Sequence, residues 1–141
     1  MINISPLEKA IEQLQESLTY TQSELALNNK GLAKQFRSSS IQAFEYTYEL
    51  AHKMLKRYLE STEPSSILID EMSFQDLIRT GAEKGLLLNS WDKWKNYRQS
   101  RNSTSHTYNE AKAEEIFQDI PTFLTEAEFL RDQINSRQNK A

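Results

Sequence analysis

Cysteine is absent from this chain of 141 residues. Without thiols the chain has no disulfide framework, no CxxC redox pair and no thiolate metal site, a pattern that fits a reducing compartment. With only two histidines, a dedicated zinc site is not expected. The three glycines and three prolines are too few for the turns of a β-sandwich or barrel, which argues against an all-β fold.

Long apolar runs are missing as well. No stretch reaches the roughly 18 apolar residues that a membrane span needs, and the first residues lack the basic and apolar regions of a signal peptide. We therefore expect a soluble, cytoplasmic protein with no membrane partner. The length predicts one domain over residues 1–141 with a polar tail at about 136–141, and 17 basic against 20 acidic residues give a net charge of −3.

Apolar residues that recur every three or four positions predict helices in the first half of the chain. Ser5 is a hydroxyl N-cap followed by proline and by Glu8 as a capping-box partner, so a helix is predicted over 6–28. Residues 32–60 contain no glycine or proline and carry two parallel apolar stripes, which predicts a central helix. Residues 61–72 lose the period and are interpreted as a loop.

The second half of the chain repeats this pattern in shorter segments. Ser73 is expected to start a short helix that ends near Gly85, and a further helix is predicted from residue 91 to about 102. A final helix is predicted from Asn109, with Pro121 expected to kink it or split it in two. The fold class is therefore all-α, an antiparallel bundle of four or five helices.

Several aromatic side chains exceed what such a bundle can bury. They lie on different predicted helices, at Tyr20, Tyr46, Phe74 and Trp91. We therefore expect a homodimer.

One segment departs from the weakly acidic composition. Residues 93–109 contain no acidic side chain, and the basic Lys93, Lys95 and Arg98 are interleaved with aromatic rings such as Tyr97. Nucleic-acid phosphates and exposed bases favour this composition, so these four residues are expected RNA contacts. The alternative is that the aromatic rings belong to the core and the lysines to a solvated face.

The sharpest feature is the spacing of Arg101 and His106. On a continuous α-helix the two side chains would point about 140° apart, so their cooperation requires the helix to stop between them. The hydroxyl run 103–105 favours such a stop. Arginine can clamp a phosphate and imidazole can transfer a proton near neutral pH. Cleavage of RNA by its own 2′-hydroxyl needs these two groups and no metal or cofactor.

The segment from Arg101 through Asn102 and His106 to Tyr108 resembles the Arg-x4-His-x-Tyr signature of HEPN domains of the HepT toxin type. Residues 37–53 resemble the second-helix block of the related nucleotidyltransferase substrate-binding proteins. In that block an acidic residue commonly follows the arginine, where this chain has Ser38. Together with the order of the helices, the similarity covers nearly the whole chain.

The resemblance implies a dimeric helical bundle in which both motifs face a shared cleft. It also implies a toxin–antitoxin pair, with a metal-independent RNase silenced by AMP transfer from a minimal nucleotidyltransferase. Carried onto this chain, Arg101 would hold the scissile phosphate, Asn102 would support the motif and His106 would act as general acid or base. Tyr108 would accept AMP.

Two other functions stay open at this point. The chain could be a non-catalytic subunit that presents a substrate to the nucleotidyltransferase, or a helical scaffold in which Arg101 and His106 only cap helices and pair with carboxylates. His52 is expected to be a packing residue. Glu45 and Glu49 are expected to be solvated or paired between helices. The carboxylates at 110, 114 and 115 open the last predicted helix, where its dipole stabilises negative charge.

Overall fold

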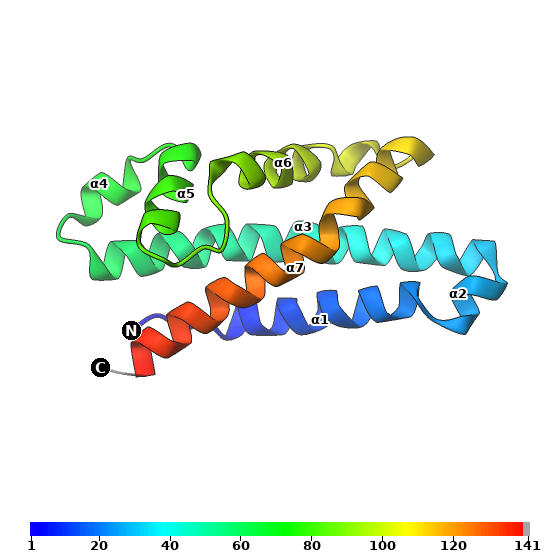
Figure 1. The fold of residues 1–141 in the computed structure, drawn as a ribbon, viewed down its shortest axis with the longest axis horizontal. Helices are drawn as coiled ribbons and strands as arrows, with labels where there is room; N and C mark the ends of the chain where they lie inside the picture. The colour runs from blue at the N-terminus through cyan, green and yellow to red at the C-terminus, as the bar shows by residue number, and fades with distance from the viewer. Residues whose placement is uncertain (140–141) are drawn as a thin grey trace.

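The computed structural model describes residues 1–139, which form seven α-helices and one 3₁₀ turn and no β-strand (Figure 1). This confirms the all-α class. The helices are α1 (Ser5–Thr21), α2 (Glu24–Asn28), α3 (Lys30–Thr62), α4 (Ser66–Asp70), α5 (Phe74–Glu83), α6 (Trp91–Asn102) and α7 (Glu110–Asn139), and the 3₁₀ turn η1 spans Thr104–His106. None of these helices combines the length and apolar character needed to cross a bilayer.

Helix α3 is the central element, as its two apolar stripes predict. It runs the length of the molecule, with α1 antiparallel along one side, α6 along the other and α7 crossing it diagonally (Figure 1). Its broad buried face includes Phe44, Ala51 and Leu55, which are at most 1% exposed. A helix that packs against several neighbours needs this wide apolar face.

An aromatic cluster joins α3, α6 and α7. Phe123 on α7 packs edge-on against Phe44 and Tyr97, with ring centroids 5.1 Å apart in both pairs. Trp94 and Tyr97 on α6 meet at 5.6 Å. Edge-to-face contacts between large rings are favourable beyond the burial of their area, so this cluster fixes the position of α6 on the bundle.

Serine caps change two of the predicted boundaries. The predicted helix 6–28 is two helices, because Ser23 accepts a hydrogen bond from the Ala26 amide and starts α2. The predicted loop 61–72 contains α4, which Ser65 caps in the same way. The Ser5 capping box does not form, since Ile4 occupies the N-cap without a side-chain hydrogen bond.

Helix α7 is not split at Pro121, and this part of the prediction is wrong. The proline lies inside one continuous helix with its ring exposed, although it has no N–H to donate to the carbonyl four residues earlier. The helix also continues through most of the tail assigned to 136–141, where the Arg137 guanidinium donates to the Lys84 carbonyl at 2.7 Å. Residues 140–141 lie outside the described part of the chain.

A buried carboxylate fixes the connection that leads into α6. Glu126 on α7 is 0% exposed and accepts hydrogen bonds from the Leu88 amide at 2.6 Å, the Asn89 amide at 3.0 Å and the Asn89 side chain at 3.1 Å. These bonds replace the water that the carboxylate loses on burial. They hold the α5–α6 connector, and thereby the start of α6, against α7.

Candidate functional site

The helix ends between Arg101 and His106, as the hydroxyl run predicts. Helix α6 stops at Asn102, and the chain continues into the 3₁₀ turn η1. The Thr104 hydroxyl donates to the Arg101 carbonyl at 2.9 Å, and the His106 amide donates to the Ser103 carbonyl at 3.0 Å. Hydroxyl side chains that bond to the last helical carbonyls favour such an end. The α-helical geometry therefore ends one residue after Arg101.

The Arg101 side chain extends from α6 to α3, where it pairs with two glutamates. Its Nε donates to Glu49 Oε1 at 2.7 Å, and its Nη2 lies 3.7 Å from Glu45 Oε1. The side chain of Arg101 is 29% exposed. This confirms the interhelical pairing expected for the two glutamates, which are one helical turn apart on α3.

His106 and Tyr108 lie in the exposed segment that follows. Their ring centroids are 6.1 Å apart and the rings are nearly perpendicular. Tyr108 is 84% exposed, so its hydroxyl is open to an incoming enzyme. Asn102 is exposed at the last position of α6.

A groove beside Arg101 separates α3 from this segment. Its volume is about 390 Å³. Side chains of both elements line it, namely Gln35, Ser38, Ser39, Ile41, Gln42 and Glu45 from α3 with Thr104 and Thr107 from the turn. Most of these side chains carry hydroxyl or amide groups, and Glu45 also faces Arg101. We call this the hydroxyl groove.

Arg37 ties the start of α7 to α3. Its guanidinium lies 2.7 Å from Glu110 and 3.5 Å from Glu114. The hydrogen bond from Arg37 holds the pKa of the Glu110 carboxyl below its usual value. The helix dipole alone was expected to explain these acids, and the structure adds a cross-helix partner. The signal in the sequence was the spacing of two carboxylates by one helical turn.

The expected RNA contacts differ in their exposure. Lys95 and Arg98 are exposed, and Arg98 lies over the Phe74 ring at 5.0 Å. Lys93 lies over the Tyr97 ring at 5.6 Å. Tyr97 itself is 0% exposed, so its assignment as an RNA contact is wrong: the ring lies in the aromatic cluster and cannot stack on a base.

His52 packs as expected of a core-edge residue. It is half-buried on α3, and its ring meets Phe74 edge-on at 4.8 Å. Burial lowers the pKa of His52 below 6.5, although the nearby Glu49 opposes this shift. In the described residues, no group of three or more histidines and carboxylates is arranged to hold a metal ion.

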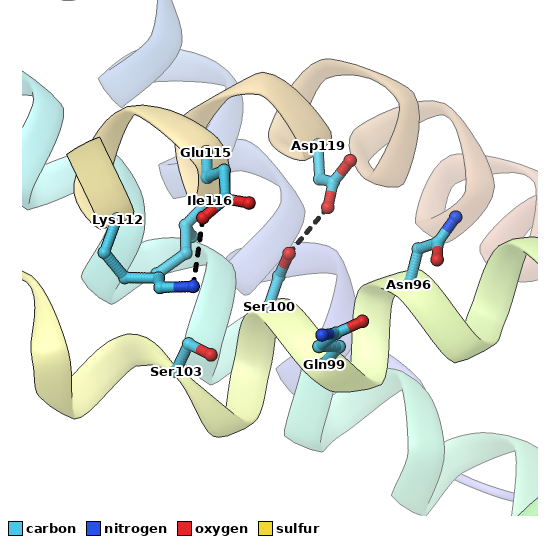
Figure 2. A pocket seen from close by; sticks show the side chains of 8 residues that line it. All are labelled: Asn96, Gln99, Ser100, Ser103, Lys112, Glu115, Ile116 and Asp119. Carbon is cyan, nitrogen blue, oxygen red and sulfur yellow. Dashed lines mark hydrogen bonds and ion pairs between the residues drawn. The ribbon is translucent and has the colours of Figure 1, made fainter.

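A second polar pocket lies on the other side of α6, where α6 faces α7 (Figure 2). Its volume is about 240 Å³. In it the Ser100 hydroxyl donates to Asp119 at 2.6 Å, and Lys112 pairs with Glu115 at 3.0 Å. The sequence does not indicate this pocket, because its lining comes from two helices without a shared motif. Since its charged groups are already paired, it is a weaker candidate site than the hydroxyl groove.

Comparison with known proteins identifies the family and the fold. Residues 2–136 match the family model described as nucleotidyltransferase substrate binding protein like. The chain is 39% identical over 100 residues to a probable ribonuclease HepT of Haemophilus influenzae, covering 71% of this chain and 68% of that protein. A solved structure from the same species, described as the fold of a substrate binding domain of a nucleotidyltransferase, superposes with a TM-score of 0.87. That match has 31% identity and covers 94% of this chain and 99% of the other. The chain therefore belongs to the HepT-like nucleotidyltransferase substrate-binding protein family.

Proposed function

We propose that this protein is a metal-independent ribonuclease, the toxin of a toxin–antitoxin pair. One observation carries the proposal: α6 ends between Arg101 and His106, so a phosphate-binding cation and a proton-transferring group lie at an exposed helix end. The relative that is called a probable ribonuclease supports the same reaction class.

The reaction needs one phosphate clamp and one proton carrier. The substrate 2′-oxygen attacks its own phosphorus, the bond from phosphorus to the 5′-oxygen breaks, and a cyclic phosphate and a 5′-hydroxyl result. Arg101 stabilises the charge on the phosphate oxygens, and His106 takes the proton from the 2′-hydroxyl or gives one to the leaving oxygen. A homodimer would bring a second copy of both groups to one cleft.

An RNA cleavage assay tests this proposal. We expect Arg101→Ala and His106→Ala each to abolish cleavage while the helical content stays close to wild type. The melting temperature should also stay close to wild type, with a small decrease in Arg101→Ala from the lost pair with Glu49. Arg57→Ala, which removes an exposed arginine of α3, is the matched control and should cleave normally. EDTA should leave the wild type active. Loss of cleavage in EDTA would show that the reaction uses a metal.

Tyr108 is the proposed site at which a minimal nucleotidyltransferase attaches AMP. The exposed hydroxyl can enter another active site, and an AMP group there would place an anion next to His106, whose ring centroid lies 6.1 Å from that of Tyr108, where it would compete with RNA phosphate. After incubation with the nucleotidyltransferase and ATP, the intact mass should rise by one or more AMP units. Tyr108→Phe should prevent this increase, and Tyr46→Phe, another exposed tyrosine, should not.

A second function is favoured by the solved relative, which is described as a substrate binding domain. In that case the chain would present a substrate or itself to the nucleotidyltransferase without cleaving RNA. Purified protein that binds the nucleotidyltransferase and leaves RNA intact under all conditions would favour this alternative.

A further inference from the structure

The two edges of the Arg101 guanidinium differ in their carboxylate partners. Glu49 accepts from Nε at 2.7 Å, a short charge-assisted hydrogen bond. Glu45 lies 3.7 Å from Nη2, which is beyond hydrogen-bond distance. Within residues 1–139, Nη1 has no carboxylate partner. One side of the guanidinium is therefore fixed, and the Nη1–Nη2 edge remains available for an anion.

The hydroxyl groove reaches Arg101 through Glu45. Glu45 belongs to both features, because it lines the groove and faces Nη2. The other lining side chains include four hydroxyls and two amides, all of which can donate hydrogen bonds to phosphate oxygens. Among the eight lining residues, Glu45 is the only one with a charge, and it repels an anion.

We propose that the hydroxyl groove binds a phosphodiester of the RNA strand, with Glu49 and Glu45 in opposite roles. Glu49 is a positioning residue that orients the Arg101 guanidinium through Nε. Glu45 occupies the phosphate side of Arg101 in the free protein and is displaced when the phosphate arrives. This inference rests on the ribonuclease function proposed above and adds the subsite for its substrate.

The difference in distance explains why the two glutamates, one turn apart, act differently. A phosphate can form two parallel hydrogen bonds with an arginine edge, which a carboxylate at 3.7 Å does not form. It therefore replaces Glu45 and leaves the shorter Glu49 contact in place. The exposed hydroxyls of Ser38 and Ser39 then extend the site along α3.

Binding of an uncleavable RNA tests the proposal. The probe is a short RNA with 2′-O-methyl groups throughout, which cannot undergo attack by its 2′-oxygen. We expect Glu45→Gln to tighten binding about threefold, which is the size of one exposed ion pair. Glu49→Ala should weaken binding about tenfold, and Glu49→Gln should recover most of this loss because its amide oxygen still accepts from Nε. Glu60→Gln, on the same helix, is the control and should match wild type.

The Arg101 side-chain signal gives a readout that a merely structural role would not change. In nitrogen–proton NMR spectra the Nε–H resonance of Arg101, assigned by its loss in Arg101→Lys, should remain in Glu45→Gln and shift or broaden in Glu49→Ala. Melting curves identify any variant that fails to fold, and Glu49→Gln then provides the comparison.

The possible outcomes distinguish failure of the phosphate subsite from failure of the ribonuclease function. If the wild type cleaves RNA and Arg101→Ala does not, but Glu45→Gln and Glu49→Ala change RNA affinity in the same direction or leave it unchanged, the subsite is refuted and the ribonuclease stands. If the wild type neither binds nor cleaves RNA, both proposals are refuted.

Discussion

Replacing Glu126 by glutamine should loosen the connector that places α6. Glutamine has nearly the same shape, but only one of its two terminal groups accepts hydrogen bonds. The carboxylate accepts on both oxygens, from Leu88 on one and from Asn89 on the other. In Glu126→Gln, a side-chain N–H must therefore face a main-chain N–H donor, whichever way the amide is turned.

The expected cost follows from the bonds that are lost. A hydrogen bond to a charged acceptor contributes about 1.5–3 kcal/mol, and a buried donor left without a partner costs about 1–3 kcal/mol. Removing the desolvated charge offsets part of this sum. We expect a net decrease of about 2 kcal/mol in the free energy of unfolding, which lowers the melting temperature by roughly 6 °C in a domain of this size.

Urea unfolding at pH 7, followed by circular dichroism, measures this difference. Asp132→Asn is the control, since it removes an exposed α7 carboxylate that pairs with its sequence neighbour Arg131. Burial raises the pKa of Glu126 above its ordinary value of 4.5. The folded protein therefore binds a proton more readily than the unfolded chain, and wild type should gain stability relative to Glu126→Gln as the pH falls towards 4.5. A glutamine variant whose free energy of unfolding lies within about 0.5 kcal/mol of wild type at pH 7 would show that these hydrogen bonds do not stabilise the connector.

Three further outcomes are expected. Because burial lowers the pKa of His52, wild type should lose stability relative to His52→Phe as the pH falls below 6.5 in urea unfolding, and parallel pH profiles would contradict this. Tyr97→Phe should cost about 1 kcal/mol through loss of its hydrogen bond to Thr122, with RNA affinity unchanged; weaker RNA binding would restore Tyr97 as a contact. Arg37→Ala should lower the melting temperature by removing its pair with Glu110, and the difference from wild type should shrink at high salt, whereas a salt-independent difference would indicate lost packing.

The long helices could be predicted because periodicity reports burial directly. The stripes of α3 and the hydroxyl run after α6 each reflect a local rule, and the structure follows both. The exposure of Tyr108 also followed from its place in a loop. Short helices such as α2 and α4 were not predicted as separate helices. A single serine cap determines where each one starts, and a cap leaves no periodic pattern in the sequence.

The partners of the site could not be predicted in the same way. Arg101 meets Glu49 across 52 positions in sequence, and only the packing of α6 on α3 brings them together. Tyr97 illustrates the opposite error, because its basic neighbours suggested a surface and its ring proved to be core. Composition identifies a segment, whereas the face of the helix decides which of its residues are accessible.

The turn that carries His106 buries no side chain. Several of its hydrogen bonds are local, such as that from the Asn109 amide to the His106 carbonyl at 3.1 Å. It can therefore open without exposing the hydrophobic core, and its local unfolding is independent of the global free energy of the bundle. Ordering this turn around a substrate then carries a conformational entropy cost that lowers affinity. A partner that rigidifies the turn beforehand would tighten RNA binding without touching the RNA.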